Sequence, residues 1–512
     1  MGKVNLDALI PREDFEAKDN SVEDSSDKSD KIKLSELEEK DNFLYPVLRK
    51  PDFQRETNEW TPNKICGLIE SFVNQDLIPS VIMWNTKGSF TFVIDGAHRL
   101  SALIAWVNDD YGDGNISRKF FGNIPEEQKE IAEKTRKLIH SKIGSYKDYK
   151  SILENQTGAE AEKITRARDM SRHSVQLQWV KGDVKKAENS FFKINQEASK
   201  INKTELTLLK SREQANGISA RAIKNSGFGH KYWHKFSKEK QDEIEKVAKE
   251  ICELIFVPPY KKPVNTLELP LAGKINSAQT LPLILNFVNI VNEFQESMDE
   301  DGKVKIEKDE NGEKTLKYLN QCKDMAQKIN SKHTTSLGLH PAIYFYSKEG
   351  NYRTASFYSV IALLVEFNKN IPLQKKFIDV RGDFEKFILD NDKEIYDLSR
   401  KYREGIKGYT HIRDYYIDVI NKLSNEESKE ILMKDLNEKI KKSKSKNFST
   451  NTKSKIFIDE AIEKSIRCKL CNGWIDSKSI TIDHIQRKRE GGSGTEDNGQ
   501  ISHPYCNTQI KN

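Results

Sequence analysis

The feature that most constrains this chain is a pair of metal-ligand motifs near its C-terminal end. Cys468 and Cys471 form a CxxC pair, and after 31 intervening residues His503 and Cys506 form an HxxC pair. Thiolate and imidazole are the ligands that Zn²⁺ prefers, and two such pairs suit one tetrahedral ion. Three of the six cysteines in 512 residues fall in this window, which favours metal over disulfides. We therefore predict a structural zinc site; chance clustering is the alternative.

A second group of polar residues lies between and after these pairs. Asp483 and His484 stand in the run TIDHI, which is followed by Gly491-Gly492, Asn498 and Asn507. Cleavage of a phosphodiester requires an activated water and neutralisation of charge on the phosphate. An imidazole is suited to deprotonate water, because it titrates near neutrality. A carboxylate or amide oxygen is suited to a hard divalent cation.

Residues 456–512 resemble the HNH endonuclease family, in particular its zinc-framed ββα-metal branch. The resemblance implies a β-hairpin and a helix that hold one catalytic Mg²⁺ or Mn²⁺. It implies that His484 is the general base, that Asp483 and Asn507 are ligands of this ion, and that Asn498 orients the base. Asn507 stands where the family usually has histidine. A zinc ribbon without catalysis is the alternative, although such a ribbon needs neither the Asp-His pair nor the two asparagines.

An α/β pattern occupies residues 32–115. The spacing of apolar residues predicts a helix over 62–77, capped by Thr61. Strands are predicted over 81–84 and 89–96, and a helix over 98–107. A strand, a tight turn at a glycine and a helix, in that order, are typical of a phosphate-binding junction.

Three short segments, two in this part and one further along the chain, resemble the ParB/sulfiredoxin-like superfamily, and most closely the branch found in GmrSD-type restriction enzymes. They are Phe53-Gln54-Arg55, Asp95 to Leu100, and Phe191 to Gln196 followed by Thr204-Glu205-Leu206. The resemblance covers residues 34–210 and implies that a nucleoside triphosphate binds there and controls DNA cleavage. Ala97-His98 stands where this branch has Gln-Gln, and sulfiredoxins have a catalytic cysteine at Ala97, so sulfiredoxin chemistry is not expected. The expected nucleotide-binding residues are Arg55, Asp95, Gly96, His98 and Arg99, with ordinary surface ion pairing as the alternative for the arginines.

The whole chain reads as an α+β multidomain protein. Helices are also predicted over 237–255, 280–297, 354–367 and 410–435, and residues 299–314 are predicted to be a loop between two helices. Residues 439–455 contain seven lysines and no acidic residue, which indicates a flexible linker that lets a nuclease module move. The expected parts are an acidic flexible arm over 1–33, a ParB-like α/β domain over 34–210, a helical domain over 211–438, the lysine-rich linker over 439–455, and the HNH module over 456–512.

Composition excludes several classes of protein. No apolar run is long enough to span a bilayer, and the N-terminal residues contain no apolar signal core, so we expect a cytoplasmic protein. The net charge of +6 is too small to indicate nucleic-acid binding by itself. Arg487-Lys488-Arg489 is a local basic patch suited to phosphates.

The motifs together predict a metal-dependent HNH endonuclease that acts on DNA under the control of a nucleotide-binding domain, in restriction or anti-phage defence. Three alternatives stay open. They are a nucleotide-gated DNA-binding regulator with a structural zinc ribbon, an RNA-cleaving toxin, and a nuclease whose N-terminal domain carries no nucleotide. Assembly into a homo-oligomer is compatible with the sequence.

Overall fold

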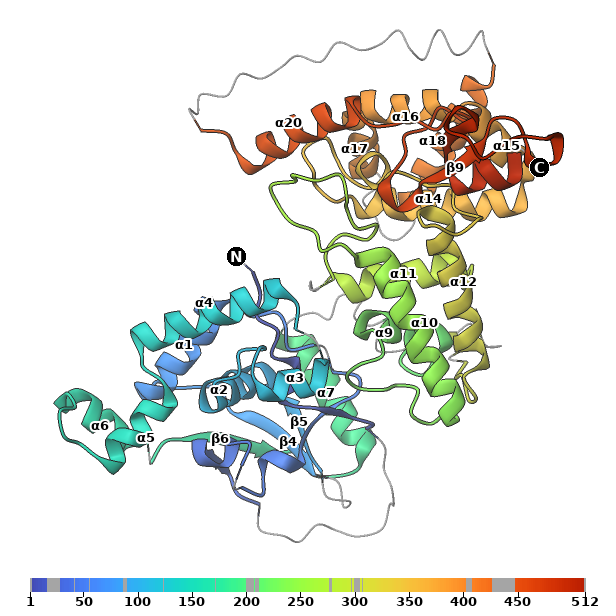
Figure 1. Cartoon of the computed structure of the whole chain (residues 1–512). Coiled ribbons are helices and arrows are strands. Elements are labelled where there is room, and N and C mark those ends of the chain that lie inside the picture. Colours follow the sequence, from blue (N-terminus) through green and yellow to red (C-terminus); the bar gives the residue numbers. More distant parts are fainter. Residues whose placement is uncertain are drawn as a thin grey trace. The chain divides into compact units, whose positions relative to one another are not determined.

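The chain folds into two compact units, which are described separately. The first unit comprises residues 1–213, 228–232 and 276–278, and the second unit comprises the rest of the chain (Figure 1). The computed structural model describes residues 2–15, 28–40, 42–54, 56–85, 90–122, 124–170, 172–198, 207, 211–275, 279–295, 297–298, 304–305, 307–401, 408–425 and 447–510.

A six-stranded mixed sheet forms the centre of the first unit. Its order is β1-β3-β5-β4-β6-β2, with β1, β3 and β5 mutually parallel, β4 antiparallel to β5 and parallel to β6, and β2 antiparallel to β6. The α+β fold class is thereby confirmed. The strands are β1 (Arg12–Glu13), β2 (Lys31–Lys33), β3 (Leu48–Pro51), β4 (Val81–Asn85), β5 (Thr91–Asp95) and β6 (Ser174–Trp179).

Helix α1 (Pro62–Val73) shows how local sequence determines the helices of this unit. The Thr61 hydroxyl accepts a hydrogen bond from the amide of Lys64, and Pro62 occupies the first turn. The apolar side of α1 is buried and packs against α2 and α4 (Figure 1). The predicted helices at 62–77 and 98–107 and both predicted strands are confirmed, although α1 ends at Val73. The other helices are α2 (Ala97–Asn108), α3 (Asn115–Phe121), α4 (Glu126–Lys142), α5 (Tyr146–Glu154), α6 (Ala161–Met170) and α7 (Val184–Ala198).

The flexible arm predicted over residues 1–33 is wrong for its described parts, 2–15 and 28–33. Strands β1 and β2 form the two edges of the sheet, and the core includes the side chains of Leu6, Leu9 and Ile32. The acidic composition that suggested disorder comes largely from residues 16–27, which lie outside the described residues. The apolar residues on either side of that run determine the outcome, because their burial offsets the cost of ordering the chain.

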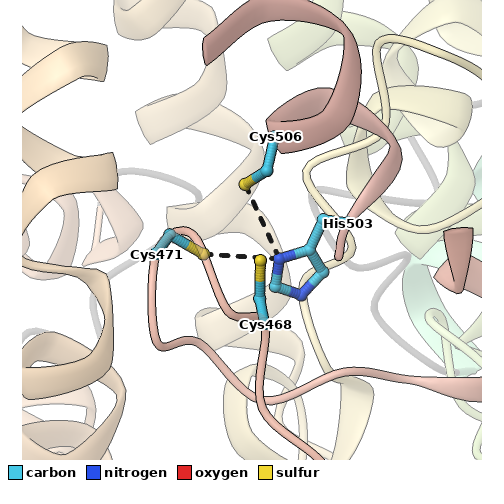
Figure 2. Close-up of side chains that lie close together, drawn as sticks. All are labelled: Cys468, Cys471, His503 and Cys506. Carbon is cyan, nitrogen blue, oxygen red and sulfur yellow. Dashed lines mark hydrogen bonds between the residues drawn. The ribbon is translucent and has the colours of Figure 1, made fainter. Parts of the chain in front are cut away.

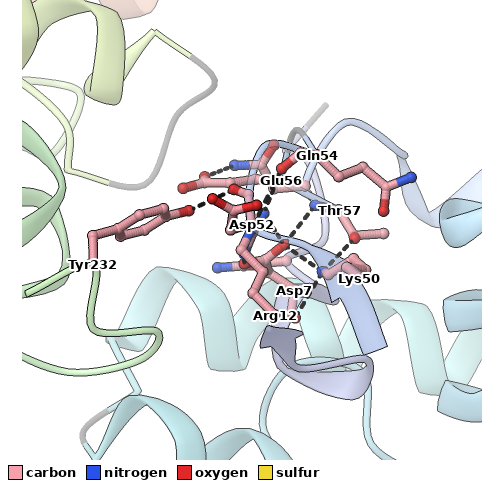
Figure 3. A network of polar contacts seen from close by, with 10 residues as sticks. Asp7, Arg12, Lys50, Asp52, Gln54, Glu56, Thr57 and Tyr232 are labelled. Carbon is pink, nitrogen blue, oxygen red and sulfur yellow. Dashed lines mark hydrogen bonds and ion pairs between the residues drawn. The ribbon is translucent and has the colours of Figure 1, made fainter. Parts of the chain in front are cut away.

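A buried ion cluster attaches this N-terminal segment to the sheet (Figure 3). The carboxylate of Asp7 accepts hydrogen bonds from Lys50 Nζ at 2.7 Å, from Arg12 Nη2 at 3.0 Å and from the amide of Thr57 at 2.9 Å. The Lys50 side chain is fully buried, and this burial lowers its pKa to about 8 although Asp7 opposes the change. One carboxylate therefore compensates two buried cations.

In the second unit, helix α10 (Lys238–Phe256) follows the predicted cap at Ser237, whose hydroxyl accepts from the amide of Lys240, and its apolar stripe is buried as expected. Helix α11 (Thr280–Val291) ends earlier than predicted, and residues 426–435 of the predicted 410–435 helix lie outside the described residues. The other helices are α9 (Ala215–Asn225), α12 (Glu313–Ile329), α13 (Pro341–Tyr344), α14 (Thr354–Lys369), α15 (Ile371–Asp379), α16 (Arg381–Asp390), α17 (Asp392–Lys401), α18 (Gly408–Leu423) and α20 (Thr450–Glu463). Two short hairpins complete the unit: β7 (Ser297–Met298) with β8 (Val304–Lys305), and β9 (Thr481–His484) with β10 (Gly499–Ser502).

The C-terminal residues pack into this second unit and do not form a separate module on a linker. Residues 450–455 of the predicted linker form the first turns of α20, where the Ser454 hydroxyl accepts from the amide of Val264 at 3.0 Å. Residues 439–446 lie outside the described residues. The side chains of Asn330 and Asp476 are hydrogen bonded at 2.8 Å and both are buried. The expectation of a freely moving nuclease module is therefore wrong.

None of the helices in the described ranges combines the length and the hydrophobicity that a membrane crossing requires.

The buried ion cluster gives a first prediction. Asp7→Asn keeps the shape of the side chain but removes the carboxylate that is hydrogen bonded to both Arg12 and Lys50. Breaking a buried ion pair in this way costs about 3–5 kcal/mol. Hydrogen exchange of peptides from β1 and β3 in increasing urea measures this loss for the first unit alone. Glu126→Gln is the control, because its pair with Lys129 is exposed and contributes less than about 1 kcal/mol. Equal stability of the two variants would contradict the prediction.

Candidate functional site

The four predicted zinc ligands converge in one buried cluster (Figure 2). The Sγ atoms of Cys468, Cys471 and Cys506 and a ring nitrogen of His503 all lie within 4.8 Å of one another. His503 Nδ1 lies 3.4 Å from Cys471 Sγ and 3.9 Å from Cys506 Sγ. Three thiols and one imidazole at such separations match the ligand set of a closed structural zinc site.

The second ring nitrogen of His503 supports the same interpretation. His503 Nε2 lies 3.0 Å from the main-chain oxygen of Trp474, a contact that requires the proton on Nε2 and leaves the Nδ1 lone pair facing the thiols. Burial, and then the nearby Arg381 cation, lower the pKa of His503, so that the imidazole is neutral as a metal ligand must be. The donor chemistry therefore fits zinc.

The predicted catalytic residues lie on or beside the β9–β10 hairpin. Asp483 and His484 are adjacent on β9, and they pair with Gln500 and Gly499 of β10. The Asp483 carboxylate is buried and accepts a hydrogen bond from Gln500 Nε2 at 2.8 Å, whereas His484 is half-buried. The contact with Gln500 orients the carboxylate, and the partial exposure of His484 leaves the imidazole accessible.

The two predicted asparagines contact the same hairpin through its main chain. Asn498 Oδ1 accepts from the amide of Gln486 at 2.6 Å, and its Nδ2 donates to the oxygens of Gln486 and Ser493. These contacts fix the chain just after His484. Asn507, on the π-helical turn Cys506–Ile510, donates from Nδ2 to the oxygen of Ile482 at 3.2 Å. The structure thus brings Asn507 beside β9, next to Asp483.

In the first unit, two of the predicted nucleotide-binding segments lie at the same end of two neighbouring strands of the sheet. Strands β3 and β5 are parallel. Phe53-Gln54 follows β3, and Asp95-Gly96 begins at the last residue of β5, so both segments lie at the carboxyl ends of their strands. Gln54 Nε2 donates to the oxygen of Ile94 at 3.2 Å and joins them. Gly96 has a left-handed φ of 93° immediately before α2. Arg55 lies outside the described residues.

Arg99 and His98 extend from the first turn of α2. Arg99 Nη2 donates to Asp95 Oδ2 at 2.8 Å and to the oxygen of Ser80 at 3.0 Å. The ring of His98 stacks on that of Trp60, with centroids 5.7 Å apart. Asp95 and Arg99 therefore form a partly exposed ion pair across the strand-to-helix turn.

The third segment packs against the first through aromatic rings. Phe191 and Phe192 of α7 lie 5.0 Å and 6.3 Å from Phe53, measured between ring centroids. The side chain of Asn195 and residues 204–206 lie outside the described residues. Three segments that are far apart in sequence thus meet in this part of the unit.

Two charged residues near the zinc-ligand cluster were not predicted from the sequence. Arg381 and Glu385 of α16 are fully buried beside it. Their spacing of four residues on a helix with apolar neighbours is the signal that could have identified a buried pair, but nothing in that spacing indicates a metal site.

The chain was compared with protein families, curated proteins and solved structures. No curated protein and no solved structure matches the chain. A family model described as "GmrSD restriction endonuclease, N-terminal domain" matches residues 32–490, which include strands β3 to β6 of the first unit, the helical region and strand β9. The chain therefore belongs to the GmrSD restriction endonuclease N-terminal domain family.

Proposed function

We propose that this protein is a metal-dependent DNA endonuclease of restriction or anti-phage defence, with an HNH active site in residues 456–510. The observation that carries this proposal is the hairpin on which Asp483 and His484 are adjacent, with the Asn507 amide bonded to the same strand. Membership of a restriction endonuclease family supports DNA as the substrate.

The residues of the hairpin have distinct roles in this proposal. The half-buried imidazole of His484 takes a proton from the attacking water. Asp483, oriented by Gln500, and Asn507 offer oxygen ligands to one divalent ion. Such an ion, when bound, neutralises charge on the scissile phosphate. Asn498 holds the main chain after the base, so that the imidazole keeps its position.

The zinc-ligand cluster serves the same hairpin structurally. The two ligand pairs lie on either side of it in sequence, at Cys468-Cys471 and at His503-Cys506. One ion bound by all four residues would fix both ends of the hairpin, while chemistry takes place at the other residues.

A nucleoside triphosphate is the proposed ligand of the first unit. The N-terminus of α2, Gly96 and the Arg99 guanidinium suit phosphate groups. The buried Oε1 atom of Gln54 has no hydrogen-bond partner among the described residues. The carboxyl ends of β3 and β5 therefore also offer an amide oxygen that can accept a hydrogen bond. In this proposal the bound nucleotide controls cleavage.

The catalytic proposal is tested with His484→Ala. Loss of the general base is expected to reduce Mg²⁺-dependent plasmid cleavage by about 10²–10⁴-fold, while DNA binding stays intact. The matched control is His411→Ala, an exposed histidine of α18. Cleavage of RNA but not DNA by the wild type would overturn the substrate, and cleavage that survives in His484→Ala would overturn the site.

The nucleotide proposal is tested with Arg99→Ala. A lost charge-assisted contact to phosphate is expected to weaken triphosphate binding by about tenfold or more, and to remove any effect of the nucleotide on cleavage. Calorimetry with each nucleoside triphosphate measures the affinity. Arg118→Ala, an exposed arginine of α3, is the control. Unchanged affinity in Arg99→Ala would place the nucleotide elsewhere.

The zinc proposal is tested with Cys468→Ser. About one zinc ion per chain is expected in the wild type and much less in the variant, because the alcohol is a far poorer ligand than the thiolate. Elemental analysis of the purified protein measures the content. Cys252→Ser replaces a buried cysteine of α10 outside the cluster and should retain the metal. Full zinc content in Cys468→Ser would contradict the assignment.

A further inference from the structure

Helix α16 of the helical region brings a buried ion pair to the zinc-ligand cluster. Arg381 Nε donates to Glu385 Oε1 at 2.7 Å, and both side chains are fully buried. A buried charge is expensive unless its hydrogen-bonding capacity is satisfied, so the other contacts of this pair indicate what it is for.

The guanidinium of Arg381 reaches the cluster directly. Its Nη1 lies 3.2 Å from His503 Nδ1 and also donates to the oxygen of Leu337, and its Nη2 donates to the oxygen of Gly338 at 2.9 Å. Two main-chain oxygens and Glu385 therefore hold the guanidinium in one orientation, against the ring nitrogen that faces the thiols.

Glu385 acts on the same histidine from the other side. Its Oε2 accepts from the amide of Trp474 at 2.7 Å, and its Oε1 accepts from the Tyr344 hydroxyl at 3.0 Å. The main-chain oxygen of Trp474 is in turn the partner of His503 Nε2. Glu385 thus orients the imidazole through the Trp474 peptide, and Arg381 places a cation beside Nδ1. The Nδ1 lone pair can bind either the guanidinium or the metal ion, so in the zinc-bound site Arg381 acts through its charge and its position.

Two glycines make this close approach feasible. A β-carbon at Gly473 would lie 2.4 Å from Arg381 Nε, and one at Gly338 would lie 2.5 Å from His503 Cδ2. Gly338 also has a left-handed φ of 62°. The main chain near the ligands is therefore shaped around the arginine and the histidine.

The net charge of the zinc-ligand cluster suits a cation beside it. Three thiolates and one neutral imidazole around Zn²⁺ leave one net negative charge in a buried place. Arg381 and Glu385 together add no net charge, but the guanidinium is the member of the pair that lies beside the ligands and so attracts the thiolates. The hydrogen bonds from Trp474 and Tyr344 stabilise the carboxylate of Glu385.

We propose that Arg381 and Glu385 are positioning residues of the zinc site, so that α16 forms part of the metal centre. This inference rests on the zinc site proposed above and deepens it. It means that zinc binding depends on two residues more than 80 positions before the first ligand, and that the ion joins the helical region to the β9–β10 hairpin.

The test compares zinc affinity in full-length variants by competition with a chromophoric chelator. Arg381→Met is expected to weaken zinc binding by about 10–100-fold, the usual effect of losing a residue that orients a metal ligand. The double variant Arg381→Met/Glu385→Gln removes both charges but keeps an oxygen for the Trp474 amide, so neither member of the ion pair is left buried without its partner. It is expected to fold, as circular dichroism and thermal unfolding can verify, and still to lose affinity to the same degree.

A second readout separates positioning from general stability. The Co²⁺-substituted protein reports ligand geometry in its visible absorption, and the band positions are expected to change in Arg381→Met and to return in part in Arg381→Lys. Arg353→Met is the matched control, because Arg353 pairs with Asp392 at 2.9 Å elsewhere in the unit. It should leave both affinity and spectrum unchanged.

The outcomes are distinguishable from those of the zinc assignment itself. A folded double variant that binds zinc within about threefold of the wild type, with an unchanged cobalt spectrum, would overturn the role of Arg381 and Glu385. A wild-type protein that holds no zinc would overturn the zinc site and this inference with it. Neither result bears on His484, because cleavage is measured separately.

Discussion

The fully buried pair of Arg381 and Glu385 is the interaction on which the C-terminal half of the second unit depends. Removing two charges from water is costly, and only dense hydrogen bonding offsets the cost. In this protein the bonds go to the loop at Leu337-Gly338, to Tyr344 and to the peptide at Trp474. These partners lie in residues 337–344 and at Trp474, so the pair connects the metal-ligand cluster, and the hairpin between its ligands, to the helical region.

The parts of the fold that could be predicted from sequence are those with local causes. Thr61 and Ser237 cap the helices that follow them, and the apolar run that ends at Gly96 marks a strand and a turn. The 1–33 arm was mispredicted because its fate is decided by distant partners: Asp7 is ordered by Lys50, which no local pattern connects to it. The same reason explains why residues 450–455, the first turns of α20, are not part of a linker, since Ser454 bonds to the distant Val264.

The candidate sites also combine features that local sequence predicts with features that depend on distant residues. The spacing of Cys468, Cys471, His503 and Cys506 predicts their convergence, because each pair is local and the pairs share one chemistry. Sequence does not reveal that the Arg99 guanidinium lies on Asp95 or that Asn498 bonds to the main chain of Gln486. Nor does it reveal Arg381, whose role follows from a tertiary contact. The candidate metal ligands can thus be identified from sequence, whereas the tertiary contacts around them cannot.

The contacts of Asn498 have a consequence for how such an enzyme can diversify. Its amide bonds both the nitrogen and the oxygen of Gln486, and its main-chain oxygen accepts from Ile485, so residues 487–497 form a loop closed at its base. Lengthening a closed loop is cheap, about 0.6 kcal/mol for each doubling. The basic run Arg487-Lys488-Arg489 lies in that loop. The length and charge of this loop can therefore change between related proteins without altering the structure of the strand that carries Asp483 and His484.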